Sequence, residues 1–391
     1  MYKKTYVEVN LDNIKNNVKT IITKYNKYKY RIGMVKSDAY GHGMYIINSL
    51  IESGINYLAT SSLDEALKIR EYNKNIPILV TEIIDLDVID KAVEENITIT
   101  IDNLEYLKKL NDKKCKIHIK LNTGMNRLGV SSKSEFNEIY DYIVKKDNIT
   151  LEGIYTHFAT PGINDVYYDK QLKKFKEITS DINLKNIPIV HLSSSFILLN
   201  HPKIDFETGF RIGTIMYGYD LSLSEYGDSY KDKLRKYRDN ILIKTNNISP
   251  VIRGNSINLK PAFKLKTNVM EIREVKKGEI IGYGHHVLKS DVKVAILPIG
   301  YESGIGTNTL NRYVLINKKK YSVIDPICMC MMFVVVDNNV KVGDEVTILG
   351  DDLTLGYLSR LNNRSIQETL VSIDKTLPRV YIKNNKIVKE I

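Results

Sequence analysis

The sequence predicts an α/β fold: a (β/α)8 barrel of the TIM type, followed by a mostly antiparallel β domain. Through the first half of the chain, short apolar runs alternate with helical patterns, which is typical of repeated βα units around a parallel sheet. From about residue 259 onward, short alternating segments are separated by glycines, which is typical of antiparallel strands. The 391 residues suffice for two domains. We expect the barrel in residues 1–240 and the β-rich domain in residues 241–391, with residues 1–10 as a strand that could pair with the second domain.

The predicted barrel elements follow one another at short intervals. Ser62 and Glu65 form a capping box that marks the start of one helix. The number of βα units suits an eight-stranded barrel better than one small doubly wound sheet, and in such barrels the reacting groups lie at the carboxyl ends of the strands. Barrel strands are predicted at residues 32–35, 57–60, 76–80, 97–101, 116–121, 151–155 and 187–191, apart from the N-terminal strand at 7–10, and helices at 45–53, from 62 onward, and at 88–94, 133–144 and 169–178.

The pattern changes beyond about residue 218. Residues 220–258 are charged and only weakly periodic, so we expect an extended linker or excursion there. The β domain is predicted to contain strands at residues 262–269, 279–283, 292–296, 313–316, 320–324, 332–336 and 345–349, and short helices at 354–361 and 366–372.

Charge and cysteine content exclude several classes of protein. The net charge of +11 comes from scattered lysines with only short runs such as 318–320, which favours a basic solvated surface over nucleic-acid binding. Three cysteines are too few for a disulfide framework, and one Cys-x-Cys pair supplies only two of the ligands of a structural zinc, so we expect no metal. No apolar run approaches the ~20 residues of a membrane helix, and no signal peptide is visible. We expect a cytoplasmic protein without a membrane partner.

The most informative stretch runs from Met34 to Gly43, with the sequence MVKSDAYGHG. Lys36 follows a buried strand, where a lysine must pair with a charge, reach solvent or act as a neutral nucleophile. A neutral amine can form a Schiff base with an aldehyde, and Tyr40 could hydrogen-bond a phosphate of the same cofactor. A lysine that extends its ammonium to solvent is the alternative.

This stretch closely resembles the pyridoxal-phosphate signature of the alanine racemase family, and the resemblance continues from Val7 to Tyr381. It implies that Lys36 binds pyridoxal 5′-phosphate covalently. It also implies that the enzyme racemises a small amino acid, L-alanine to D-alanine by default. Family members are homodimers with shared active sites, so we expect the same here.

A second string, from Lys120 to Gly129, carries Arg127 on a glycine-flanked loop. A planar guanidinium suits a carboxylate or a phenolate. The resemblance implies that Arg127 binds the cofactor O3′ and the substrate carboxylate. Lys120 matches a lysine that is carbamylated in some family members, a modification that the sequence does not reveal.

Three further strings follow apolar runs. By the resemblance, His157 lies near the pyridine ring and helps to hold Arg211, and Ser195 binds the phosphate. Gly213 and Thr214 could bind the phosphate through their backbone N–H groups, because glycine-bearing turns suit that task. Arg211 would face the pyridine nitrogen, and because guanidinium keeps its proton, that nitrogen would stay unprotonated.

The second domain is expected to supply the other catalytic base. Racemisation needs a base on each face of the α-carbon. The string Ile281-Gly282-Tyr283-Gly284 matches the family's catalytic tyrosine, so Lys36 and Tyr283 would form the pair, with Tyr283 reaching the site of the partner subunit. The backbone N–H of Met329 could bind the substrate carboxylate.

Four positions depart from the family pattern. Cys330 replaces an aspartate, Gln367 replaces a tyrosine, and Gly162 and Thr307 replace an aspartate and an arginine at the substrate entrance. Because both members of that ion pair are lost, no charge is left unpaired. The departures suggest a pocket that accepts a larger or more polar side chain, such as that of serine.

Three alternatives remain open. The chain could be a serine or broader-specificity racemase, an amino-acid decarboxylase of the same architecture, or a non-catalytic pyridoxal-phosphate-binding protein. Cys330 favours the decarboxylase, since such enzymes use a cysteine of the second domain, whereas the strings around Lys36 and Tyr283 favour a racemase. Residues 259–391 argue against the non-catalytic class, whose members generally lack a second domain.

Overall fold

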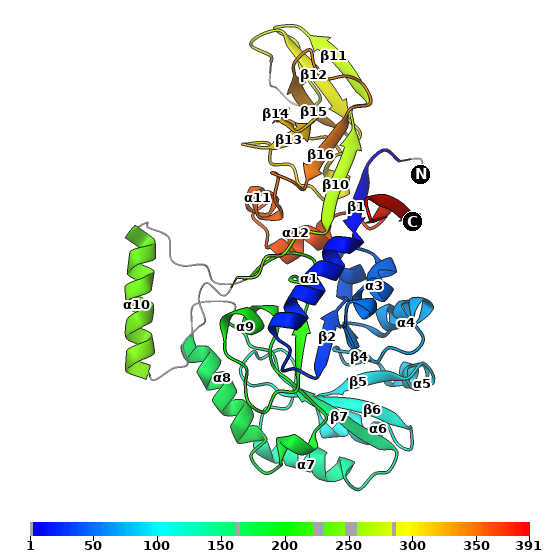
Figure 1. Ribbon diagram of the computed structural model, residues 1–391, viewed down its shortest axis with the longest axis vertical. Helices are drawn as coiled ribbons and strands as arrows, with labels where there is room; N and C mark the ends of the chain where they lie inside the picture. Colours follow the sequence, from blue (N-terminus) through cyan, green and yellow to red (C-terminus); the bar gives the residue numbers. More distant parts are fainter. Residues whose placement is uncertain (1–2, 161–164, 222–229, 247–255, 284–286) are drawn as a thin grey trace. The chain divides into compact units, whose positions relative to one another are not determined.

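The computed structural model describes residues 3–160, 165–221, 230–246, 256–283 and 287–391 (Figure 1). The chain divides into two compact units, each described below by itself. The first, here called the barrel unit, comprises Lys15–Ser37 and Met44–Lys260, and the second, called the β unit, comprises Met1–Ile14, Asp38–Gly43 and Pro261–Ile391.

Eight parallel strands form the sheet of the barrel unit, in the order β8-β7-β6-β5-β4-β3-β2-β9 (Figure 1). Hydrogen bonds from Thr208 N to Val190 O (3.0 Å) and from Arg211 N to Ser193 O (2.8 Å) join the two outer strands. The TIM-type barrel is therefore confirmed. The strands are β2 (Tyr30–Met34), β3 (Tyr57–Thr60), β4 (Ile78–Val80), β5 (Ile97–Ile101), β6 (Cys115–Lys120), β7 (Ile149–Tyr155), β8 (Ile189–His191) and β9 (Gly209–Ile212).

Three α-helices among the described residues of this half of the chain, α4, α6 and α7, begin at a residue whose side chain caps the helix. The side chain of Ser62 accepts a hydrogen bond from Glu65 N and starts α4, and Asn103 and Ser132 cap α6 and α7 in the same way. The helices are α1 (Leu11–Lys24), α2 (Lys36–Tyr40), α3 (Ile47–Glu52), α4 (Leu63–Tyr72), α5 (Ile89–Glu94), α6 (Leu104–Lys109), α7 (Lys133–Ile143), α8 (Asp165–Ile178), α9 (Ser195–Asn200) and α10 (Tyr230–Asn246), with short 3-10 turns at Met44–Ile46, Leu86–Val88 and Leu184–Asn186.

The β unit contains a ten-stranded sheet in the order β11-β12-β15-β14-β13-β16-β10-β1-β17-β18. All neighbouring pairs are antiparallel except β1 with β17, which confirms a mostly antiparallel domain. The strands are β1 (Tyr6–Asn10), β10 (Phe263–Asn268), β11 (Glu271–Val275), β12 (Val292–Leu297), β13 (Tyr313–Ile316), β14 (Lys319–Ile324), β15 (Met332–Val336), β16 (Glu345–Leu349), β17 (Arg379–Lys383) and β18 (Lys386–Glu390), and the helices are α11 (Leu355–Leu361), α12 (Ile366–Ser372) and a 3-10 turn at Tyr301–Ser303.

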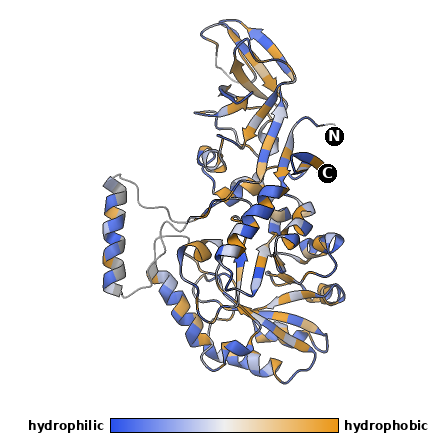
Figure 2. Ribbon diagram, in the orientation of Figure 1, coloured by the Kyte–Doolittle hydropathy of each residue, from blue (hydrophilic) through white to orange (hydrophobic). Residues whose placement is uncertain are grey.

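Two element predictions were wrong. No strand covers residues 279–283, where only Ile280 pairs with Val287 in an isolated bridge, because the backbone turns at Gly282 with φ +63. Within the predicted linker 220–258, residues 230–246 form α10, whose lysines, arginines and two leucines are good helix formers despite weak periodicity. Figure 2 shows hydrophobic residues interspersed with hydrophilic ones along α8 and α10. None of the described helices combines the length and apolar character needed to cross a bilayer.

Candidate active site

The predicted barrel residues follow the carboxyl ends of four strands. Lys36 lies two residues after β2, His157 two after β7, Ser195 four after β8 and Gly213 directly after β9. The carboxyl ends of parallel barrel strands share one rim, so these residues belong to the same end of the barrel. This is the end where the chemistry of such barrels takes place.

Lys36 precedes a left-handed helical turn. Ser37, Asp38, Ala39 and Tyr40 have φ values of +53, +57, +53 and +54. Each residue with a Cβ pays about 1–2 kcal/mol in this conformation, so four in succession must be held by their surroundings. The Lys36 side chain is partly buried and makes no hydrogen bond or ion pair with the described residues. Its amine is thus available to a ligand.

Contacts within the β unit hold the end of this turn. The buried His42 places Nδ1 2.9 Å from Ala39 O and 3.2 Å from Tyr40 O, so the Nδ1–H donates to both carbonyls. Burial lowers the pKa of His42 to about 4, which keeps the ring neutral. Burial raises the pKa of Tyr40 to about 12, which keeps its hydroxyl protonated and able to donate.

The two glycines of the motif meet residues from the end of the chain. The guanidinium of Arg379 donates to Gly41 O from Nε (3.3 Å) and Nη2 (3.2 Å), and the hydroxyl of Tyr381 donates to His42 O (3.1 Å). A Cβ on Gly43 would lie 2.0 Å from the Tyr381 hydroxyl oxygen. The motif therefore needs glycine at position 43 for a close approach as well as for its φ of +83.

Arg211 is buried and uses both terminal nitrogens within the barrel. Nη1 donates to His191 Nδ1 (2.8 Å) and to His191 O, and Nη2 donates to Thr156 O (2.7 Å), Leu192 O (3.2 Å) and His157 Nδ1 (3.3 Å). Burial lowers its pKa to about 10, so the guanidinium remains charged at neutral pH. Nε donates no hydrogen bond within the described part of the chain. One N–H group remains for an acceptor.

His157 is held neutral beside this guanidinium. Burial, followed by the positive charge of Arg211, lowers the pKa of His157 to about 3. Because Nδ1 accepts from Arg211, the remaining ring proton lies on Nε2. The predicted contact between His157 and Arg211 is present.

Ser195 and Gly213 contact each other directly. Gly213 N donates to Ser195 Oγ over 2.9 Å, and both Ser195 and Thr214 are buried. Among the described residues, the backbone N–H of Thr214 has no hydrogen-bond acceptor. The Ser195 hydroxyl proton and the Thr214 N–H are therefore two donors suited to an anion.

Lys120 and Arg127 place two cations near Arg211. Burial, followed by the positive charges of Arg127 and Arg211, lowers the pKa of the Lys120 amine to about 8. The Lys120 amine lies 5.7 Å from the ring centroid of Tyr155. Arg127 itself is exposed, on a loop that Asn122 Oδ1 fixes by accepting from Gly124 N (3.2 Å) and Asn126 N (2.9 Å).

Tyr283 and Met329 are exposed on the β unit. Tyr283 is 77% exposed and Met329 is 54% exposed. The turn around Met329 is pinned by Tyr301 N, which donates to Cys328 O (3.1 Å), and by Glu302 N, which donates to Met329 O (3.1 Å). The Met329 N–H has no acceptor among the described residues, so it can bind a ligand.

The departures from the family pattern lie in different surroundings. The Cys330 thiol donates to Glu302 Oε2 (3.2 Å), and this hydrogen bond raises the pKa of Cys330. Gln367 and Thr307 are exposed. Gly162 and Gly284 lie outside the described residues.

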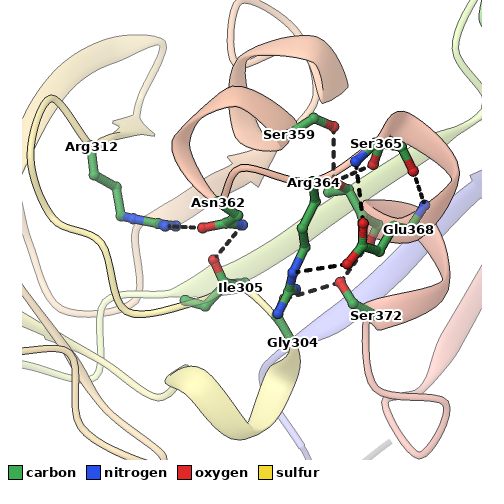
Figure 3. Close-up of polar contacts among 10 residues, drawn as sticks. Gly304, Ile305, Arg312, Ser359, Asn362, Arg364, Ser365, Glu368 and Ser372 are labelled. Carbon is green, nitrogen blue, oxygen red and sulfur yellow. Dashed lines mark hydrogen bonds and ion pairs between the residues drawn. The ribbon is translucent and has the colours of Figure 1, made fainter.

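The neighbour of Gln367 has a structural role. Glu368 and Ser365 form a capping box at the start of α12. Arg364 pairs with Glu368 (3.9 Å), and Arg364 Nη1 donates to Gly304 O (3.2 Å), as Figure 3 shows. In the same view, Arg312 Nη2 donates to Asn362 Oδ1 (2.8 Å). Glu368 therefore fixes the helix that presents Gln367.

The sequence interpretation missed three polar residues beneath this rim: the buried His118 and Glu207 and the partly buried Glu152. Each is a polar side chain within or beside an apolar strand, which was the only signal for it. His118 and His191 are fully buried, and Glu207 is 2% exposed. Buried polar groups of this kind require partners, and these partners come from other strands.

Two family models match the chain. The model of the alanine racemase N-terminal domain matches residues 9–221, and that of the alanine racemase C-terminal domain matches residues 262–381. A curated relative, alanine racemase 1 of Clostridium acetobutylicum, is 34% identical over 404 residues, covering 98% of this chain and 97% of the relative. The solved alanine racemase of Clostridium difficile has a TM-score of 0.87 at 28% identity, covering 100% and 99% of the two chains. A histidine racemase from Leuconostoc mesenteroides shares the fold, with a TM-score of 0.82 at 23% identity, covering 98% and 99%.

Proposed function

Because the chain belongs to the alanine racemase family and is an amino-acid racemase, we propose that it interconverts L-alanine and D-alanine with pyridoxal 5′-phosphate bound to Lys36. The observation that carries this proposal is the Lys36 amine. It lies at the barrel rim without a hydrogen bond or ion pair to the described residues, directly before a strained turn. Arg211, His157 and Ser195 share that rim.

The residues present suit the cofactor chemically. The phosphate would be held by the Ser195 hydroxyl, the Tyr40 hydroxyl and the backbone of Gly213 and Thr214. The Nε–H of Arg211, which has no acceptor among the described residues, suits the unprotonated ring nitrogen. When bound, pyridoxal 5′-phosphate withdraws electrons from the α-carbon of an amino acid and so acidifies its α-proton.

An unprotonated ring nitrogen suits racemisation in particular. Guanidinium does not give up its proton in the usual pH range, so Arg211 would leave the ring a weaker electron sink. Negative charge at the α-carbon is then short-lived and quickly reprotonated. His157 would lie beside the ring and steady Arg211 through the 3.3 Å hydrogen bond.

Two residues of this chain would move the α-proton. The Lys36 amine and the Tyr283 hydroxyl would each take or give a proton at the α-carbon, one on each face. Arg127 and the N–H of Met329 would hold the substrate carboxylate and fix the α-carbon between these groups.

We also propose a homodimer in which Tyr283 completes the site of the partner subunit. This proposal is supported by the exposure of Tyr283 and by other large apolar side chains that one copy of the β unit leaves exposed. They are Met270, Ile280, Val287, Tyr301, Met329 and Met331. A cytoplasmic location is part of the proposal and is consistent with Cys115, Cys328 and Cys330 being free thiols.

The proposal is tested on protein purified with pyridoxal 5′-phosphate. Borohydride reduction followed by peptide mapping should label Lys36, and a chiral assay should find D-alanine formed from L-alanine. The Lys36→Ala variant should lose both the visible absorbance of the bound cofactor and turnover. An unlabelled Lys36 would contradict the proposal. Release of carbon dioxide would also contradict it, because carbon dioxide is the product of the alternative, a decarboxylase that uses the Cys330 thiol.

A further inference from the structure

A line of polar side chains, here called the histidine line, runs from the buried Arg211 through the buried His191 and His118 to the partly buried Glu152. Arg211 Nη1 lies 2.8 Å from His191 Nδ1, His191 Nε2 lies 2.9 Å from His118 Nδ1, and His118 Nε2 lies 3.3 Å from Glu152 Oε2. We propose that Glu152, His118 and His191 are positioning residues. The contacts among them fix one tautomer of each histidine and thereby the orientation of the Arg211 guanidinium.

Arg211 determines which nitrogen donates and which accepts in each hydrogen bond of the line. A guanidinium has donors only, so His191 Nδ1 must accept. His191 Nδ1 therefore carries no proton, and a neutral His191 has its proton on Nε2. The reversed tautomer would bring two N–H groups together 2.8 Å apart.

The same logic passes to the next two residues. His191 Nε2–H donates to His118 Nδ1, so His118 Nδ1 accepts and its proton lies on Nε2. His118 Nε2 lies 3.3 Å from Glu152 Oε2, an electrostatic contact whose geometry falls short of a hydrogen bond. Arg211 Nη1 and His191 Nε2 thus each have a ring-nitrogen acceptor, and no other assignment of the protons on the two histidines achieves this.

Both histidines are neutral, because each is fully buried and lies near the cationic Arg211. Burial and the charge of Arg211 lower the pKa of His118 and of His191. Glu152 is ionised, since the contact with His118 and the hydrogen bond from Tyr57 outweigh the effect of burial and lower its pKa to about 2. The Glu152 carboxylate also accepts from Tyr57 (2.6 Å) and Thr98 (2.9 Å).

The His118 ring occupies space that a side chain at position 153 would fill. A Cβ on Gly153, the residue paired with His118 in the neighbouring strand, would lie 2.6 Å from His118 Cε1 and 2.8 Å from Nδ1. The Tyr155 ring stacks on His191 with 4.8 Å between the ring centroids. The two rings are therefore confined from the sides as well as through their nitrogens.

The functional consequence rests on the function proposed above. With both terminal nitrogens of Arg211 held, only Nε–H is presented for a ligand, and its direction follows from the histidine line. An altered tautomer at His191 would rotate or displace the guanidinium. The effect would fall on turnover more than on substrate binding, because none of the three positioning residues belongs to the proposed substrate-binding set.

The tautomers can be measured directly by magic-angle-spinning NMR. Full-length protein saturated with pyridoxal 5′-phosphate is labelled with ¹⁵N-histidine, and the signals of His118 and His191 are assigned by their loss in single variants. We expect a protonated Nε2 and an unprotonated Nδ1 in both residues. A proton on His191 Nδ1 would overturn the proposal.

Two nearly isosteric variants then test the role of the line. His118→Asn retains an acceptor for His191 Nε2–H, whereas His118→Leu removes it. We expect His118→Asn to keep the His191 tautomer and most of kcat. We expect His118→Leu to alter the tautomer and to lower kcat about tenfold, with a smaller change in KM. Thr98→Val, which removes one donor to Glu152, is the control and should change neither.

The outcomes separate this inference from the proposed function. If the wild-type protein shows the expected tautomers but does not turn over alanine, the inferred histidine line stands and the proposed function is contradicted. If His118→Leu retains both the wild-type tautomer and kcat, the positioning role is wrong even where racemisation is observed. If His118→Leu does not fold, the wild-type spectrum and the His118→Asn rates still decide.

Discussion

The carboxylate of Glu207 accepts two hydrogen bonds from Ser193, one from its backbone N–H (2.6 Å) and one from its hydroxyl (2.8 Å). It also accepts from Leu192 N (2.6 Å). The residues between His191 and Ser195 are therefore fixed by one buried side chain.

Glu207→Gln should destabilise the protein. The amide keeps one acceptor oxygen but places an NH₂ group near donors of the other oxygen, which include the Tyr28 hydroxyl (3.3 Å). A buried donor left without its acceptor costs about 1–3 kcal/mol. Denaturant unfolding measures the loss. Glu105→Gln, at a side chain that is 80% exposed and pairs with Lys109, is the matched control and should change stability by less than about 0.5 kcal/mol. Equal effects of the two variants would contradict the role of Glu207.

Gly300→Ala should disturb the turn that presents Met329. A Cβ at this position would lie 2.2 Å from both Cys328 O and Met329 O, so the backbone must shift. We expect KM for the amino acid to rise by about tenfold or more, because a displaced N–H no longer meets the substrate carboxylate. Steady-state kinetics check this.

Gly356→Ala is the control for Gly300→Ala. Gly356 lies in α11, and the nearest atom to an added Cβ is 3.6 Å away. Alanine is the better helix former by about 1 kcal/mol, so this variant should be at least as stable as wild type with unchanged KM. An unchanged KM in Gly300→Ala as well would remove Met329 from the proposed substrate site.

Lys120 should make stability rise with pH in the alkaline range. Its pKa is lowered from the ordinary 10.5 to about 8 in the folded protein. Between these values the unfolded lysine binds more protons than the folded one, so the free energy of unfolding increases with pH. Lys120→Met lacks this contribution. Its stability should therefore rise less than that of wild type between pH 8 and pH 10.5, as measured by denaturant unfolding at each pH. Parallel profiles would mean that Lys120 does not titrate there.

Much of the fold follows from local patterns. The apolar run Ile97–Ile101 is strand β5 with the predicted limits, and Ser62 starts a helix through its capping box, because burial and capping act within a few residues. Helix α1 was missed, although Leu11, Ile14, Val18 and Ile21 are buried at helical spacing, because the helix begins directly after β1 without a turn signal.

The candidate site was only partly predictable. Lys36, Arg211 and Ser195 were found from strings that resemble a family, but the sequence SDAY contains no glycine and does not predict four positive φ values. Contacts such as that between His118 and Glu152 depend on the register of β6 against β7, in which His118 pairs with Gly153. Register is a property of the folded sheet, so it cannot be read from either strand alone.

Tyr283→Phe should separate the two proton transfers. If Tyr283 is one base of a pair, removing its hydroxyl should lower racemisation by about 10²- to 10⁴-fold. Exchange of the α-proton with deuterated solvent should persist for one enantiomer, because Lys36 still serves one face. Tyr237→Phe, at a side chain 68% exposed on α10, is the control and should have no effect. Equal loss of exchange for both enantiomers would exclude the two-base assignment.

Gln367→Tyr should change the choice of substrate. Gln367 is exposed on α12, and it supplies a donor and an acceptor where the family has an aromatic side chain. If its amide hydrogen-bonds a hydroxyl, the variant should favour alanine over serine by about tenfold more than wild type, since a lost polar contact costs roughly 1–3 kcal/mol. The measurement is kcat/KM for L-alanine and L-serine. Gln367→Ala separates the effect of losing the amide from the effect of adding the tyrosine ring. Loss of the amide lowers kcat/KM for serine in both variants, whereas only the tyrosine can raise kcat/KM for alanine. If neither variant alters the ratio, the side chain at position 367 does not contact the substrate, and its replacement of tyrosine has no bearing on specificity.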